Sequence, residues 1–262
     1  MSRATGPGPR SLELLTWLCR VGASPTAPLA AAHGLPERTT RDHLLRLRRA
    51  GLVDRWPTLN GDALYAATKH GHRQLERPWR GSRQRPHEFE HIVAIAQTAA
   101  WLSTTPTCSW WRAERELHVS VPPDGQDPDQ WSSSYVIADR DGQGAIHTRT
   151  PDLVASLADT VTAIEVERTQ KEGRRLRAIL TGWGRALQKQ HVGRVIYVVP
   201  DERMSRVIER ARTDAAKTVA ALGTDALLIR TLDQLEPLSV PTGHAGTGGH
   251  PEAEESPAAL VV

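Results

Sequence analysis

The most constraining feature of this chain is a short, almost entirely apolar segment in its C-terminal third. Residues 194–200 read Arg-Val-Ile-Tyr-Val-Val-Pro, and helical patterns lie on either side of them, at 172–190 and 201–222. A strand that is apolar on both faces is typical of a parallel strand that helices cover from both sides. The segment therefore predicts an α/β unit built around a central sheet.

Six further segments belong to this unit, which we expect to cover residues 88–237. They are a helix at 89–103, a turn entering a strand at 110–119, a weaker strand at 135–138, two strands about a tight turn at 151–157 and 160–168, and a last short strand at 226–229. The order is helix, three strands besides the weaker one, helix, strand, helix, strand. This order is typical of an α/β sandwich with a mixed sheet.

The first part of the chain, residues 10–77, has a different pattern. Ser11 can cap a first helix, a short second helix includes residues 29–32, and a third helix covers 36–50 until Gly51 ends it. In the third helix the inward stripe consists of Thr40, Leu44 and Leu47. The outward positions are Arg38, Thr39, Arg41, Asp42 and Arg46. This part is therefore expected to open with three helices.

A hairpin follows the three helices. Residues 53–56 and 63–67 have strand patterns, and the turn between them contains Asn60-Gly61, a dipeptide suited to positive φ. A further helix begins near residue 68. The stretch 44–55 together with 65–71 resembles the winged helix-turn-helix family. The resemblance implies that the third helix enters the major groove of DNA, with Arg38, Thr39, Arg41 and Arg46 facing the bases, and that Arg55 and Asn60 lie near phosphates.

The distribution of charge supports a polyanionic partner for this first part. Residues 1–87 hold 15 Lys/Arg and 6 Asp/Glu, whereas the whole chain has a net charge of only +3. Nearly all the basic residues are arginine, which binds phosphate and guanine in a bidentate manner. Two alternatives stay open: the arginine excess reflects a GC-rich genome, or the winged helix pairs with protein. A basic linker at 78–87 either follows phosphates or is a solvated tether.

Carboxylates gather on neighbouring strands of the second unit. Glu165 and Glu167 share one face of their strand, while Ile164 and Val166 point to the other layer. Asp152 opens the preceding strand and is expected alongside. Converging carboxylates raise one another's pKa unless a cation lies between them, and clusters of oxygen ligands suit Mg²⁺ or Mn²⁺. The alternative is a strand with one polar, solvated side.

Pro151-Asp152 followed by Glu165-Val166-Glu167, in this strand order, resembles the PD-(D/E)XK nuclease superfamily. The resemblance implies metal binding by Asp152 and Glu165, with Glu114 or Glu116 as an additional upstream acid. It also implies a lysine two positions after the first glutamate, but residue 167 is Glu. Lys171 is the nearest ammonium, and Gln170 is a second candidate. The implied catalytic set is Asp152, Glu165, Glu167 and Lys171, acting in metal-assisted phosphodiester hydrolysis.

The whole combination resembles the replication-relaxation family of plasmids and mobile elements. The resemblance rests on the winged helix, on His87 and His91, and on the Trp111–Leu117 stretch. It also rests on the Pro-Asp and Glu-Val-Glu motifs and on the apolar strand at 194–200. The histidines lack an HExxH context, so we expect packing or surface roles rather than zinc binding. Arg174, Arg175 and Arg177 either meet a DNA backbone or face solvent. The resemblance implies a role in plasmid replication, or in DNA relaxation and conjugation at a transfer origin.

The sequence thus predicts an α/β two-domain protein, an N-terminal winged helix-turn-helix followed by a PD-(D/E)XK restriction-endonuclease-like α/β/α domain. The expected partners are double-stranded DNA and relaxosome or replication proteins, with a homodimer as a further expectation. The alternative is a non-catalytic regulator or accessory factor with a degenerate nuclease fold. No apolar run or leader pattern indicates a membrane, so we expect a cytoplasmic protein with Cys19 and Cys108 reduced. Residues 238–262 are expected to be disordered.

Overall fold

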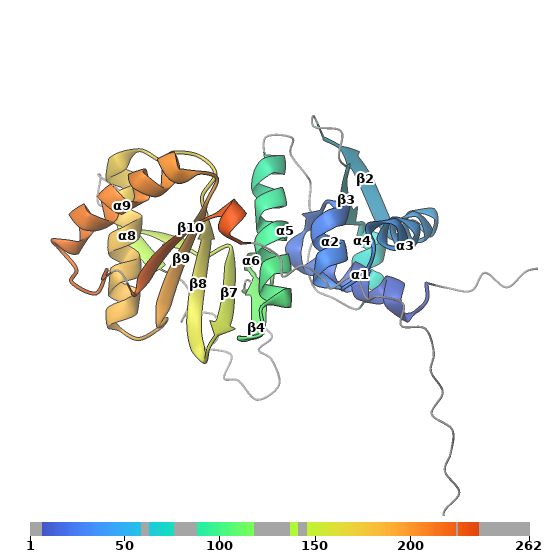
Figure 1. The fold of residues 1–262 in the computed structure, drawn as a ribbon, viewed down its shortest axis with the longest axis horizontal. Coiled ribbons are helices and arrows are strands. Elements are labelled where there is room, and N and C mark those ends of the chain that lie inside the picture. Colours follow the sequence, from blue (N-terminus) through green and yellow to red (C-terminus); the bar gives the residue numbers. More distant parts are fainter. Residues whose placement is uncertain are drawn as a thin grey trace, which may run out of the picture.

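The computed structural model is a mixed α/β protein (Figure 1), and it describes residues 7–58, 63–75, 88–117, 137–140, 146–223 and 225–235. The predictions for Asn60, the 78–87 linker, His87 and the 238–262 tail lie outside these residues. Within them the strands form a three-stranded, a five-stranded and a two-stranded sheet. In this part of the chain, no helix combines the length and the apolar character needed to cross a membrane.

The N-terminal elements pack as helices against a small antiparallel sheet of order β1-β3-β2. They are α1 (Pro9–Val21), β1 (Ala23–Ser24), α2 (Thr26–Ala32), α3 (Glu37–Arg49), β2 (Val53–Pro57), β3 (Ala63–Ala67) and α4 (Lys69–Gln74). The predicted stripe of α3 is confirmed, because Thr40, Leu44 and Leu47 are fully buried. Gly51, at φ +71°, follows the helix in a conformation that favours glycine, as its predicted stop position requires.

The C-terminal elements surround the five-stranded sheet of order β10-β9-β8-β7-β4. They are α5 (Phe89–Thr104), β4 (Cys108–Ala113), α6 (Glu114–Leu117), β5 (Ile137–Arg140), β6 (Ile146–Arg149), β7 (Leu153–Leu157), β8 (Thr160–Val166), α8 (Gly173–Gln188), β9 (Arg194–Val199), α9 (Glu202–Ala216), β10 (Leu227–Thr231) and the 3₁₀ turn η2 (Leu232–Gln234). Strands β8, β9 and β10 are parallel, while β4, β7 and β8 are joined antiparallel. The predicted mixed sheet is confirmed, and β9 is buried along most of its length.

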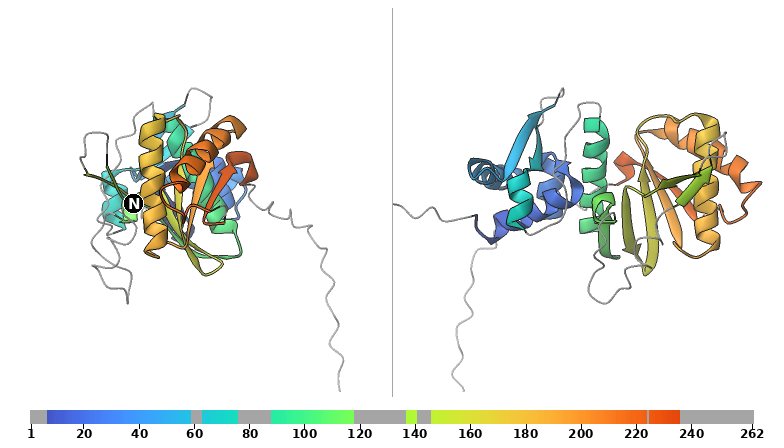
Figure 2. Two further views of the ribbon diagram at one scale, coloured as in Figure 1. Left: turned by 90° about the vertical axis from the view of Figure 1, so that its left-hand side faces the viewer. Right: turned by 180° about the vertical axis from the view of Figure 1, so that it is seen from behind.

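Helices cover both faces of this sheet. In Figures 1 and 2, α8 and α9 lie on one face and α5 on the other, and α5 lies between most of the sheet and the N-terminal helices. Ile164 and Val166 of β8 belong to the cluster on the α5 side, which continues into α1. Ala163 belongs to the cluster on the α8 side. Helix α3 lies at the end of the molecule far from the sheet (Figure 1).

Three sequence expectations differ from the structure. Residues 114–117 form α6 instead of continuing a strand from 110 to 119, because the β4 ladder with β7 ends at Ala113. Ser11 does not cap α1: the helix begins at Pro9 after Gly8, and the Ser11 hydroxyl lies 2.8 Å from His43 Nδ1 in α3. Strand β6, which pairs with β5, was not expected at all.

Candidate functional site

A basic surface covers the exposed side of α3. The helix carries five arginines against two acidic residues, and its three buried side chains leave the arginines on the outside. Arg38, Arg41 and Arg46 are all exposed, as predicted, whereas Thr39 is half-buried. Arg41 Nη2 donates to Glu37 Oε2 at 2.8 Å, and Arg46 Nε donates to the Asp42 carbonyl at 3.1 Å. The basic side chains are therefore oriented along the helix, on its solvent side.

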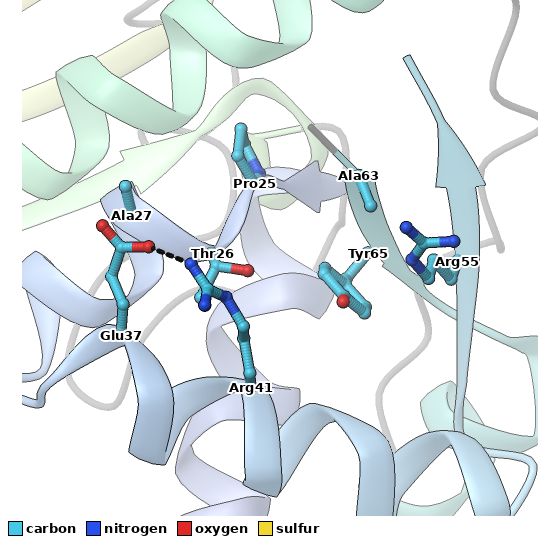
Figure 3. Close-up of a pocket in the computed structure, with 8 residues that line it drawn as sticks. All are labelled: Pro25, Thr26, Ala27, Glu37, Arg41, Arg55, Ala63 and Tyr65. Atoms are coloured by element: carbon cyan, nitrogen blue, oxygen red, sulfur yellow. Dashed lines mark hydrogen bonds and ion pairs between the residues drawn. The ribbon is translucent and has the colours of Figure 1, made fainter. Parts of the chain in front are cut away.

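Strand β2 extends this surface beside α3. Arg55 and Trp56 are exposed on β2, and Trp56 is one of two large apolar side chains that the described residues leave exposed. Between α2, α3 and the β2–β3 hairpin lies a pocket of about 430 Å³. Arg41 and Arg55 flank Tyr65 in it (Figure 3). Two guanidinium groups around a concave polar surface favour the binding of an anion such as a phosphate.

The acidic residues of the second unit meet at one end of the β7–β8 pair. Leu153 pairs with Ile164, so Asp152 and Glu165 occupy the next position of the same ladder. On either side, the Glu114 amide donates to the Asp152 carbonyl at 2.8 Å, and Glu165 pairs with Tyr197 of β9. The ladder therefore brings Asp152 and Glu165 side by side, as the sequence predicted, and places the Glu114 backbone next to Asp152. We use "acidic cluster" below for Asp152, Glu165 and Glu167.

Glu165 is buried, and its carboxylate is occupied by two neighbours. Arg149 of β6 donates from Nε to Oε1 at 3.1 Å and from Nη2 to Oε2 at 3.2 Å. Trp183 Nε1 of α8 donates to Oε1 at 3.2 Å. Burial and the charge of Asp152 raise the pKa of Glu165, while Arg149 acts in the opposite direction. An ionised Glu165 therefore depends on a cation beside its oxygens.

Asp152 has internal partners as well. Its Oδ2 accepts from the Val166 amide at 2.7 Å, and its Oδ1 lies 3.3 Å from His91 Nε2 of α5. The hydrogen bond with Asp152 raises the pKa of His91. His91 is therefore not a plain surface or packing residue, because it connects α5 to the acidic cluster.

Glu167 and Lys171 form an ion pair at the end of β8. The Glu167 amide donates to the Val198 carbonyl of β9 at 2.8 Å, which extends the β8–β9 hydrogen bonding by one residue. Glu167 is therefore held next to the end of β8. Lys171 Nζ contacts Glu167 Oε2, and both side chains are largely buried. Burial lowers the pKa of Lys171 to about 8, and Arg149 acts in the same direction. The structure thus brings Lys171 to the predicted region, displaced from position 167 but within the influence of the same carboxylates.

These donors do not fit the expected Mg²⁺ or Mn²⁺ ion as they are arranged. A hard divalent ion needs several oxygen ligands that are free to coordinate it. Here both Glu165 oxygens accept from Arg149, and both Asp152 oxygens have protein partners. Among the residues that the structure describes, no group of three His, Cys, Asp or Glu could hold a metal ion. The cationic role at Glu165 is filled by Arg149.

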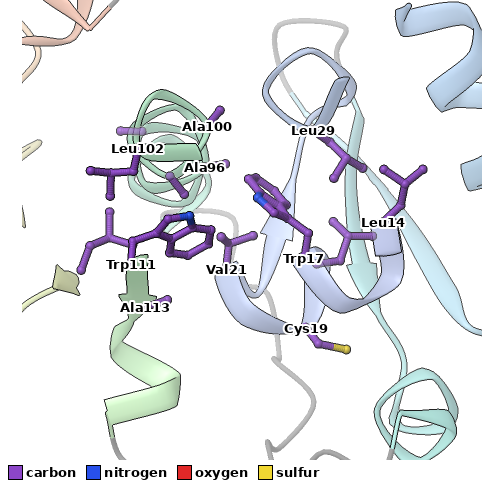
Figure 4. Close-up of a cluster of buried hydrophobic side chains, with 14 of the residues drawn as sticks. Leu14, Trp17, Cys19, Val21, Leu29, Ala96, Ala100, Leu102, Trp111 and Ala113 are labelled. Carbon is purple, nitrogen blue, oxygen red and sulfur yellow. The ribbon is translucent and has the colours of Figure 1, made fainter. Parts of the chain in front are cut away.

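Close packing connects α1 to the five-stranded sheet. Trp17 of α1 and Trp111 of β4 meet edge to face with ring centroids 6.5 Å apart, beside Val21 and the α5 side chains (Figure 4). The Arg20 guanidinium lies 3.7 Å from the centre of the Trp111 ring, and its Nε donates to Glu116 at 3.0 Å. Glu116 therefore pairs with Arg20 of α1.

Arg149, Trp183 and Tyr197 are residues of this site that the sequence did not point to. Arg149 belongs to β6, and the sequence of that strand, Ile146-His147-Thr148-Arg149, holds one apolar residue and no alternation that would mark it as a strand. Tyr197 was expected only within an apolar strand and Trp183 only within a helix, yet Trp183 Nε1 donates to Glu165. Burial and Glu165 raise the pKa of Tyr197 well above its usual value. Polar atoms on largely apolar side chains are not distinguished by hydrophobic pattern alone.

Comparison with known proteins gives little further guidance. No family model matches the chain, and no curated protein matches it. One solved structure, described as the crystal structure of protein VC1899 from Vibrio cholerae, aligns with 12% sequence identity and a TM-score of 0.33. The alignment covers 88% of this chain and 55% of that one. A likeness at this level carries no argument about function.

Proposed function

We propose that this chain is a DNA-binding protein whose basic surface on α3 and β2 binds duplex DNA, and that its second unit does not cut DNA. In this proposal the N-terminal elements are a winged helix, and the five-stranded sheet with its helices is a nuclease-like α/β/α domain. The order of three helices followed by the β2–β3 hairpin supports the first assignment. The adjacent acids Asp152 and Glu165, at one end of the β7–β8 pair, support the second.

The observation that carries the proposal is the placement of the arginines. Helix α3 buries only its apolar stripe and presents Arg38, Arg41 and Arg46 to solvent, next to Arg55 across the pocket. A helix whose exposed face is basic suits the major groove, and the pocket suits a backbone phosphate. The resemblance to the replication-relaxation family extends the proposal. In it, the protein acts at a plasmid replication or transfer origin, together with relaxosome or replication proteins.

The test is duplex binding by fluorescence anisotropy at several salt concentrations. We expect Arg41→Ala with Arg46→Ala to weaken binding at least tenfold and to reduce the salt slope by roughly one for each phosphate that the variant no longer binds. The matched control is Arg203→Ala with Arg206→Ala, two exposed arginines on α9. Equal binding by the α3 variant and the wild type would remove the DNA-binding role from this surface.

Hydrolysis is the second candidate function, and one observation favours it. Asp152 and Glu165 occupy the same row, with Lys171 close enough to be influenced by both. Cleavage would require Arg149 to leave Glu165, since a metal ion and a bidentate guanidinium cannot use the same oxygens. A supercoiled-plasmid assay with Mg²⁺ or Mn²⁺ separates the two candidates, because nicking that Asp152→Ala abolishes would establish the hydrolytic one.

A further inference from the structure

We propose that the Arg149 guanidinium takes the place of a metal ion in the acidic cluster, so that this site holds a divalent cation only when Arg149 is removed. The inference deepens the non-cutting half of the proposed function and rests on it. Its test measures metal binding. The inference about Arg149 can therefore fail while DNA binding by α3 holds, and DNA binding can fail while the inference about Arg149 holds.

The contact between Arg149 and Glu165 has the geometry of a dedicated pair. Two parallel N–H groups meet the two carboxylate oxygens, which is the strongest and most directional way to bind a carboxylate. The Glu165 side chain is 3% exposed and that of Arg149 27% exposed, so the acid has no access to bulk water that could replace the arginine. A buried carboxylate in this position needs a positive partner.

The backbone that carries Arg149 is itself anchored. Ile137 of β5 is opposite Arg149 in the β5–β6 ladder, and it is buried in the same cluster as Leu176 and Trp183 of α8. Trp183 in turn donates to Glu165. The hairpin therefore holds Arg149 over the acid from the α8 side of the sheet, and the arginine is not an incidental surface neighbour.

With His91 protonated, the charges around the site are balanced without an ion. Asp152, Glu165 and Glu167 face the cations Arg149 and Lys171, and His91 adds a third positive charge when it is protonated. Removing Arg149 frees Glu165 Oε2 next to Asp152, whose Oδ1 has, among the described residues, only the partly exposed His91 as its partner, and it leaves an excess of negative charge. This is the chemistry that binds Mg²⁺ and Mn²⁺ in proteins.

The experiment uses thermal unfolding of the full chain with increasing Mn²⁺, supported by the Mn²⁺ signal in electron paramagnetic resonance. We expect no saturable change for the wild type or for Arg149→Lys, which keeps the charge. We expect Arg149→Met to unfold at lower temperature without metal. Its Tm should then rise by roughly 5 °C when Mn²⁺ is present at about 100 times its Kd. The double variant Arg149→Met with Glu165→Gln should fold but show no response.

Three results would overturn the proposal. One is saturable Mn²⁺ binding by the wild type that Asp152→Ala removes, since the site would then accept metal with Arg149 present. Another is a folded Arg149→Met protein that binds no Mn²⁺. The third is failure of both Arg149→Met and the milder Arg149→Gln to fold even when Mn²⁺ is supplied, because the ion should replace the missing charge.

Discussion

At the scale of single residues, His91 makes the stability of the acidic cluster depend on pH. Its pKa is raised in the folded protein through the hydrogen bond with Asp152. The stabilisation is therefore complete below the unfolded value, about 6.5, and is lost as pH rises through the folded pKa. We expect His91→Gln to cost about 0.5–1 kcal/mol at pH 5.5 and much less at pH 8, because the pair is partly exposed.

The measurement is chemical denaturation of the wild type and His91→Gln at both pH values. His191→Gln, at an exposed histidine after α8, is the matched control and should show no such difference. A His91→Gln penalty that is equal at pH 5.5 and pH 8 would mean that the contact with Asp152 does not involve a charged imidazole.

At the scale of elements, α4 packs closely against the residue before β2, and the position of the β2–β3 hairpin depends on this contact. A Cβ at Gly71 would lie 2.3 Å from the Leu52 carbonyl oxygen, and backbone cannot move aside as a flexible side chain can. We expect Gly71→Ala to destabilise the protein by about 1–3 kcal/mol and to weaken DNA binding near the unfolding temperature. Gly173→Ala is the control: its Cβ meets nothing within 4 Å, so its effect should stay under about 1 kcal/mol. An equal loss of stability in both variants would contradict this packing.

Some of these elements could be predicted from the sequence and others could not. The apolar stripe of α3, the β7–β8 hairpin and the buried strand β9 follow from periodicity, because each buries the residues that its pattern marks. Strand β6 and helix α6 do not, since each has four residues and depends on its neighbours. The position of Asp152 beside Glu165 was predictable from spacing. The pairing of Glu165 with Arg149 was not, because it depends on where a separate hairpin packs.

At the scale of the whole molecule, Arg20 joins helix α1 to the five-stranded sheet. It contacts the Trp111 ring, the Trp111 carbonyl and Glu116. We expect Arg20→Ala to cost about 2 kcal/mol, because the variant has no cation–π interaction with Trp111 and leaves Glu116 with a partly buried charge. Hydrogen exchange should then show that α1–α4 and β1–β3 open separately from the five-stranded sheet. Arg73→Ala, at an exposed arginine of α4, is the control. Exchange that stays uniform in Arg20→Ala would show that the two parts are joined by other interactions.

Binding of duplex DNA without cleavage is tested most directly with one supercoiled plasmid, Mg²⁺ and a single gel. We predict slower migration with the wild-type protein, no such shift with Arg41→Ala plus Arg46→Ala, and recovery of intact supercoiled plasmid once the protein is digested. Nicked circles that appear with the wild type and disappear with Asp152→Ala would contradict this prediction, as would migration that the wild-type protein leaves unchanged.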